Sequence, residues 1–341
     1  MDNVLVEVTR GPIAENLVRG HIAVISEDGL IAGVGDPRHF THMRSTAKPV
    51  QATVVIESGA ADAFGFTDRE IAVMCSSHIA ESCHVEAVES ILEKIGLTEE
   101  NLLLYKDYSL SPALREKRIA DHEPMRLIYN NCSGKHASML AVCRHLDLPI
   151  DSYYELSHPV QQRILGIISE YAEYPREKIV TGLDGCGVPV FAMPLENIAR
   201  TYLNLAHPEN LPERHQRAAK RVVRSITEYP EYLFGSGFLS TELIRATGGR
   251  IICKVGSDGV FALSSRAEKL ALAIKIESGD MWKVKFVVME ALRQLGLLTK
   301  EETERLSPFS KEDTINCHGL LAGTTRPVFT LEPYPQSSSM M

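Results

Sequence analysis

The chain has 341 residues, of which 44% are hydrophobic and 23% are charged, with a formal net charge of −8 at pH 7. These values are typical of a globular protein with one large domain or two closely joined ones, and they exclude a disordered chain. They also argue against a nucleic-acid partner, because binding phosphates requires clustered lysine and arginine.

Neither a secretory leader nor a membrane span is expected. The first seven residues carry acidic side chains and no basic region, and no apolar run of about 18 residues follows. The cysteines are odd in number and scattered along the chain, at positions 75, 83, 132, 143, 186, 253 and 317. We therefore expect a cytoplasmic protein with reduced thiols, some of which could bind a metal.

The chain opens with strand signals and then turns helical. Residues 5–9 and 21–26 are rich in β-branched side chains, and residues 27–30 (EDGL) predict a hairpin turn. Residues 49–59 predict an apolar helix that ends at its glycine. Thr67 and Glu70 form a capping-box pattern, which predicts a short helix that stops at a small polar segment, residues 75–78 (CSSH).

The middle of the chain is mainly helical, and sheet returns after it. Helices are predicted at 85–95, at 159–172 and at 195–205, with a short strand at 179–181. One further helix starts at 111, and another follows the polar segment 129–136 and ends near 146. Strands follow at 250–255, 260–264 and 270–276, and then a helix over 281–297. This order predicts an α+β fold, with a central antiparallel sheet and a helical insertion over about 68–228. We expect a single hydrolytic unit over residues 1–334 and a disordered tail at 335–341.

One short motif could carry chemistry. The sequence RSTAKP, residues 44–49, places Ser45 and Lys48 three positions apart at a predicted helix start. Residues at this spacing share a helix face, so the Lys48 amine could accept the Ser45 proton as the oxygen attacks a carbonyl. Lysine acts as a base only where burial or nearby positive charge lowers its pKa. In the alternative interpretation, Ser45 caps the helix and Lys48 is a solvated residue of its first turn.

Two polar segments contain cysteines that could meet a metal. Cys132 lies in NCSGKH, residues 131–136, and Cys186 lies in DGCGVP, residues 184–189. A pair of thiolates in glycine-containing turns suits zinc. Alternatively, each cysteine is a small buried hydrophobic residue. On the residues alone, His136 would be the third ligand and Lys135 a surface residue.

Three segments resemble signatures of the serine β-lactamases and penicillin-binding proteins. Ser45 and Lys48 match the first signature, Ser-x-x-Lys. Residues 76–78 (SSH) could supply the loop serine of the second signature, and residues 254–256 (KVG) occupy the position of the third, Lys-Thr-Gly. The second and third segments depart from the pattern, since no asparagine follows Ser77 by two positions and Val255 replaces threonine. These departures disfavour a plain β-lactamase.

A fuller resemblance covers nearly the whole chain. The segments 44–49, 76–78, 131–136, 184–189 and 254–256 together resemble the Rhizobium etli-type, or class 3, L-asparaginases, an asparaginase II-like family. The resemblance implies a serine β-lactamase/glutaminase-like fold, two Ser-Lys tandems, one zinc ion and a homodimer. The residues it implies are Ser45 with Lys48 and Ser77 with Lys254 as the tandems, Cys132, Lys135 and Cys186 as zinc ligands, and Asp184 beside them. Arg44 and His136 are candidates for contact with the substrate.

The expected reaction is therefore hydrolysis of L-asparagine to L-aspartate and ammonia, through an ester on a serine. Three alternatives stay open at this point. One is another serine amidase of the β-lactamase/glutaminase type, which a β-lactam would acylate. The second is a hydrolase that uses zinc-bound water and does not need Ser45. The third is a binding protein with a structural zinc, which would release no ammonia.

Overall fold

The structure is a computed structural model that describes residues 3–334. The chain forms two compact units. Unit 1 comprises Met1–Thr46, Met193–Leu203 and Glu242–Met341, and unit 2 comprises Ala47–Ala192 and Asn204–Thr241. The expected tail at 335–341 lies outside the described residues. The assignment of one hydrolytic unit stays a prediction, because the compactness of two parts does not decide whether they act together.

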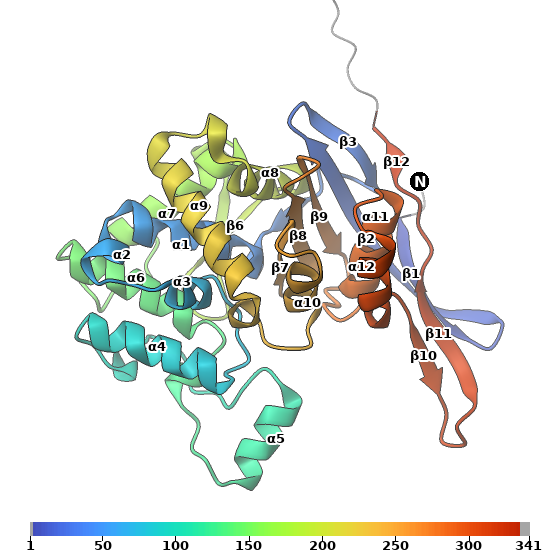
Figure 1. Ribbon diagram of the computed structural model, residues 1–341, viewed down its shortest axis with the longest axis horizontal. Coiled ribbons are helices and arrows are strands. Elements are labelled where there is room, and N and C mark those ends of the chain that lie inside the picture. The colour runs from blue at the N-terminus through green and yellow to red at the C-terminus, as the bar shows by residue number, and fades with distance from the viewer. Residues whose placement is uncertain (1–2, 335–341) are drawn as a thin grey trace, which may run out of the picture. The chain divides into compact units, whose positions relative to one another are not determined.

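Unit 1 is built on an antiparallel sheet (Figure 1). Its main path runs in the order β10-β11-β1-β2-β9-β8-β7, and β3 pairs with β2 and β12. Strand β2 is long, so its first half pairs with β1 and its second half with both β3 and β9. The strands are β1 (Val4–Arg10), β2 (Ile13–Ser26), β3 (Gly29–Val34), β7 (Ile251–Gly256), β8 (Val260–Ser265), β9 (Leu270–Ile276), β10 (Glu312–Ile315), β11 (Leu321–Pro327) and β12 (Glu332–Pro333).

Short elements complete unit 1. Helix α11 (Val284–Gln294) packs on the sheet, against β9 and β11, and α12 (Lys300–Arg305) follows it (Figure 1). Strand β4 (Phe40–His42) precedes a 3-10 turn, η1 (Arg44–Ala47), which runs directly into the first α-helix. The chain passes between the units four times, at 46–47, at 192–193, within α8 (Leu195–Ala206) and within α10 (Leu239–Ala246).

Unit 2 is mainly helical, and α1 (Lys48–Glu57) lies at its centre. Every residue of α1 from Lys48 to Ile56 is buried, and the helix packs against α6, α7 and α9. A helix that is apolar on all sides is stable only when surrounded in this way. The other elements are α2 (Ala60–Ala63), α3 (Asp68–Met74), α4 (Ser82–Lys94), α5 (Pro112–Ala120), α6 (Ser133–His145), α7 (Pro159–Ala172), α9 (Glu213–Glu228) and the hairpin of β5 (Val180–Leu183) and β6 (Pro189–Pro194).

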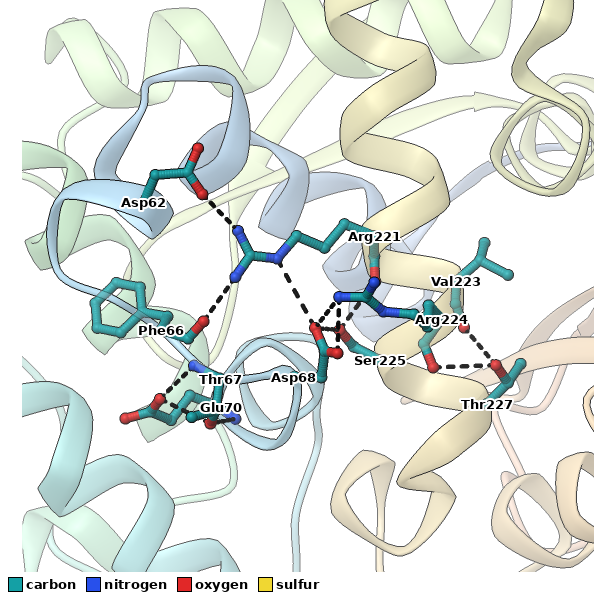
Figure 2. A network of polar contacts seen from close by, with 10 residues as sticks. All are labelled: Asp62, Phe66, Thr67, Asp68, Glu70, Arg221, Val223, Arg224, Ser225 and Thr227. Carbon is teal, nitrogen blue, oxygen red and sulfur yellow. Dashed lines mark hydrogen bonds and ion pairs between the residues drawn. The ribbon is translucent and has the colours of Figure 1, made fainter.

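A polar network joins α2, α3 and α9 (Figure 2). From α9, Arg221 contacts Asp62 at 2.9 Å and donates to the Phe66 carbonyl at 2.6 Å, while Arg224 contacts Asp68 at 2.8 Å. The carboxylate of Asp68 lies in the first turn of α3, where the helix dipole also favours it. The network therefore fixes the start of α3, whose other end leads into the segment around Ser77.

The predicted α+β class is confirmed, with antiparallel sheet in unit 1 and helices in unit 2. The capping box of Thr67 and Glu70 is present, with Thr67 N–H donating to Glu70 at 2.6 Å. The predicted helix over 281–297 is shorter, Val284–Gln294, and the N-terminal half of β2 and all of β10 and β11 were not predicted. Within residues 3–334, no helix combines the length and the apolar character that crossing a bilayer demands.

Candidate active site

A buried lysine lies next to a serine in unit 2. Lys48 is the first residue of α1, and its side chain is 1% exposed. Its Nζ donates to the Ser77 hydroxyl at 3.0 Å, to the Ser76 carbonyl at 2.7 Å and to the Asn131 carbonyl at 3.3 Å, and lies 3.3 Å from the Cys132 sulfur. The expectation of a solvated lysine at position 48 is therefore wrong. The hydrogen bond from Lys48 to the Ser77 hydroxyl joins two residues that the resemblance had assigned to different Ser-Lys tandems.

The environment of Lys48 shifts its pKa downward. Burial lowers the pKa of Lys48, and the nearby positive charge of Lys135 lowers it further, whereas Cys132 and Cys186 act in the opposite direction. A lower pKa makes a lysine a better proton acceptor near neutral pH. The direction of the shift is therefore the one that the Ser45–Lys48 motif requires of its amine.

Backbone pairing fixes the loop that carries Ser77. This loop follows α3 and has no helix or strand of its own. The Ser77 N–H donates to the Leu233 carbonyl and the Ile79 N–H to the Phe234 carbonyl, both at 3.0 Å. Because alternate residues of an extended segment make these bonds, the Ser77 side chain is held in one direction, toward Lys48.

His78 ties the same loop to α6. Its Nδ1 accepts a hydrogen bond from the Ala80 N–H at 3.1 Å, so its proton is on Nε2, which donates to the Ser133 hydroxyl at 2.8 Å. Burial holds the pKa of His78 well below its ordinary value, so the ring is neutral. The backbone of Ala80 is in the left-handed region (φ 59°), and Arg118 donates to its carbonyl at 2.6 Å. This role of His78 was not predicted, because its partner Ser133 is distant in the chain.

Thiols and amines gather at the start of α6. Cys132 precedes the helix and Lys135 lies in its first turn, while Cys186 comes from the turn between β5 and β6. The Lys135 Nζ lies 2.9 Å from the Cys186 sulfur and 3.9 Å from the Asp184 carboxylate. Lys135 is 2% exposed, so the expectation of a surface residue is wrong. Gly134 lets α6 approach α3, because a Cβ there would lie 2.2 Å from the Val73 carbonyl oxygen.

The two cysteines shift each other's pKa in opposite directions. A hydrogen bond from the Cys132 thiol and the ammonium of Lys135 lower the pKa of Cys186, whereas the same hydrogen bond and burial raise the pKa of Cys132. Cys186 is therefore the sulfur that loses its proton more readily and forms the thiolate. The thiolate in turn raises the pKa of Lys135 despite burial.

His136 lies beside the thiolate. Its Nδ1 bonds the Tyr153 hydroxyl at 2.7 Å, and that hydroxyl accepts from the Leu103 N–H at 3.0 Å. Its buried Nε2 has no hydrogen-bond partner among the described residues. Cys186 raises the pKa of His136, but burial has the larger effect and lowers it. A buried nitrogen without a partner is costly unless another group comes to it.

The donor set suits zinc. Two cysteine sulfurs and an amine nitrogen stand together in a buried site beside an unpartnered imidazole nitrogen, and zinc favours sulfur and nitrogen donors. The candidate ligand atoms of another group, Glu81, Cys83 and His84, lie within 4.8 Å of one another. It is not available to a metal, because His84 accepts from the Glu81 N–H at 3.0 Å and bonds the Glu231 carbonyl at 2.9 Å.

The remaining predicted residues belong to unit 1. Ser45 lies in η1, immediately before the chain enters unit 2. Arg44 forms an ion pair with Asp258, in the turn after β7, a partner that the sequence did not suggest. Lys254 lies on β7, and its Nζ donates to the Val255 carbonyl at 2.7 Å. The pairings of Ser45 with Lys48 and of Ser77 with Lys254 stay predictions.

Comparison with known proteins gives a family match. The profile of the family described as L-asparaginase II matches residues 6–327. No curated protein sequence matches the chain significantly. Among solved structures, a β-lactamase from Mycobacterium bovis is 15% identical with a TM-score of 0.40, over 81% of this chain and 94% of that one. A D-alanine carboxypeptidase from Burkholderia cenocepacia is 13% identical with a TM-score of 0.40, over 82% and 94%. Both the sequence identities and the TM-scores are low, so these two structures carry no argument about this chain.

Proposed function

The chain belongs to the L-asparaginase II family, and from that premise we propose that it hydrolyses L-asparagine to L-aspartate and ammonia through a seryl ester. The observation that carries the proposal is the buried amine of Lys48, 3.0 Å from the Ser77 hydroxyl. An amine that has a lowered pKa and touches a hydroxyl inside a fold is suited to moving protons during acyl transfer.

In the proposed first step, Lys48 takes the proton of the Ser45 hydroxyl as its oxygen attacks the side-chain amide carbon. The tetrahedral adduct collapses when the carbon–nitrogen bond breaks, and the leaving nitrogen receives a proton from the Lys48 ammonium through the Ser77 hydroxyl. Ammonia leaves, and a β-aspartyl ester remains on Ser45. Lys48 then takes a proton from water as the water oxygen adds to the ester carbonyl, and it returns this proton to the Ser45 oxygen as the carbon–oxygen bond breaks and L-aspartate departs.

Three other residues have supporting parts in the proposal. Lys254 pairs with Ser77 and adds positive charge that keeps Lys48 uncharged. Arg44, a half-buried ion-pair partner of Asp258, binds the carboxylate of the substrate, for which a planar guanidinium is well shaped. His136 also contacts the substrate.

Cys132, Lys135 and Cys186 would hold the zinc, and Asp184 would hold Lys135 in place from 3.9 Å. When bound, zinc supplies positive charge that helps to position a polar substrate. The proposal also includes a homodimer and a cytoplasmic location, as the sequence resemblance implies.

Ammonia release from L-asparagine and L-glutamine, measured side by side, tests the proposal. Ser45→Ala should lower turnover of L-asparagine at least 10³-fold, on the order of the loss when a nucleophile is removed from comparable enzymes. Ser77→Ala should slow it less. Ser169→Ala on α7 is a matched control, because that hydroxyl bonds only the Tyr174 carbonyl, at 2.7 Å.

Other outcomes would assign the alternatives. Full activity in Ser45→Ala together with loss of activity on removing zinc would favour a metal-bound water as the nucleophile. Hydrolysis of a chromogenic β-lactam would favour a penicilloyl-type enzyme. Binding of L-asparagine without ammonia release would leave only a binding protein.

A further inference from the structure

Unit 2 contains a cavity at the end of α1 opposite to Lys48. It has a volume of about 520 Å³ and lies among α1, α7 and α9. This volume is typical of a site for a small organic ligand. The residues that line it are Val54, Glu57, Ser58, Pro159, Gln162, Arg163, Gly166, Ile167, Glu170, Arg176, Arg214 and His215.

The two carboxylates of the cavity are already engaged. The buried ring of His215 bonds Glu57 through Nδ1 at 2.7 Å and Glu170 through Nε2 at 2.5 Å. Arg214 also contacts Glu170, at 2.8 Å. Glu57 and Glu170 bind opposite edges of one ring, so they cannot converge with it on a single metal ion. Neither carboxylate is left to neutralise the other cations that line the cavity.

Two guanidinium groups therefore have donors to spare. Arg163 makes no ion pair or side-chain hydrogen bond within residues 3–334, and Arg176 contacts only the amide of Gln162. A guanidinium offers five N–H donors in a planar fork that matches a carboxylate. Four cationic groups against two carboxylates leave the cavity with an excess of positive charge.

The rest of the lining is apolar or small. Val54, Pro159 and Ile167 offer hydrocarbon surface, and Gly166 has no side chain to occupy the space. A lone inorganic anion would leave most of such a cavity unfilled. Two spare guanidiniums and a short apolar surface suit a ligand with two carboxylates and a few carbon atoms between them.

We propose that this cavity is a binding site for a small organic dicarboxylate, held by Arg163 and Arg176. The inference goes beyond the proposed function and does not depend on it, because binding is measured without turnover. The site shares α1 with Lys48, since Glu57 at one end of that ten-residue helix lines the cavity and Lys48 begins the other.

Isothermal titration of the full chain with succinate tests the proposal. Succinate has two carboxylates and no amide to hydrolyse. In the double variant Arg163→Gln with Arg176→Gln, affinity should fall at least tenfold, because two charge-assisted contacts are lost. The control is Arg217→Gln, an exposed arginine of α9 that does not line the cavity, and it should bind as the wild type does.

A second variant blocks the space and leaves the charges intact. A Cβ at Gly166 would meet only the Arg176 guanidinium, at 3.9 Å, and the residue lies within α7, so Gly166→Leu fits the helix and fills the cavity. It should abolish the heat of binding while its unfolding midpoint stays at or above that of the wild type. No heat with the wild-type chain at millimolar succinate would overturn the proposal. Equal affinity in the double variant, or in Gly166→Leu, would also overturn it, since succinate would then bind elsewhere.

Discussion

His215 is the best place to test the energetics of unit 2. It is 1% exposed and joins three helices, since Glu57 belongs to α1, Glu170 to α7 and His215 itself to α9. Replacing it in His215→Gln keeps much of the volume and removes the positive charge. The variant then leaves the buried Glu57 carboxylate with at most a neutral donor.

The structure sets the size of the effect. The bond to Glu57, whose side chain is 9% exposed, should contribute about 1.5–3 kcal/mol, as charge-assisted bonds do. The bond to Glu170 is to a side chain that is 42% exposed, so solvent screens it and it contributes at most about 1 kcal/mol. Because glutamine restores part of one bond, we expect a loss of about 2–3 kcal/mol in the free energy of unfolding near pH 6.

The effect should depend on pH in a definite direction. Burial alone would lower the pKa of His215, but Glu57 and Glu170 raise it above its ordinary value. Arg214 also faces Glu170, and Tyr171 donates to the His215 carbonyl at 3.1 Å. A raised pKa in the folded state means that the stabilisation is complete below the unfolded pKa of about 6.5 and is lost as pH rises through the folded pKa.

Urea unfolding of the wild type and His215→Gln, at about pH 6 and about pH 9, measures this difference. The gap in unfolding free energy between the two proteins should be larger at the lower pH, and groups that titrate in both proteins cancel from the comparison. An equal gap at both values would refute the reasoning, since the ring would then be neutral throughout. A gap that widened at high pH would refute it as well.

Three further predictions concern packing, the polar network and the metal. Gly134→Ala should lower stability by about 1–3 kcal/mol in a urea titration, because its Cβ would meet the Val73 carbonyl oxygen at 2.2 Å, and unchanged stability would contradict that packing. Arg221→Met should increase amide hydrogen exchange in the first turn of α3, where the network of Figure 2 is anchored, and unaltered protection would remove that role. Cys132→Ala with Cys186→Ala should abolish zinc binding in metal analysis of purified protein, and an unchanged zinc content would reject the ligand assignment.

Local signals predicted much of the fold. The helix at Pro159–Ala172 and the strand at Leu270–Ile276 have the predicted limits, because a proline at a helix start and a short apolar run are signals contained within a few residues. The pairing of β11 with β1 was out of reach, because it joins residues such as Val6 and Pro327 across almost the whole chain. Pairing partners at that distance leave no periodic signal in either strand.

The candidate site was predictable in composition and not in its contacts. The family resemblance singled out Lys48, Ser77, Cys132 and Cys186, and unit 2 brings the first three into one cluster. The contact of Lys48 with Ser77 and the burial of Lys135 were not predicted, because both depend on how α6 and the loop after α3 pack around α1. Lysine is so often exposed that no local rule would have placed two of them inside.

The order of segments has a consequence for synthesis on the ribosome. Unit 2 takes nearly all of its residues from the stretch between positions 47 and 241, whereas the sheet of unit 1 needs β1 from the beginning of the chain and β11 from near residue 327. While the polypeptide emerges, the helical part can reach its native contacts first, and the early strands must wait without their partners. During that interval the edges of these strands are unpaired. Nascent chains of this protein should therefore associate wrongly through these edges, and a chaperone should be needed most at this stage.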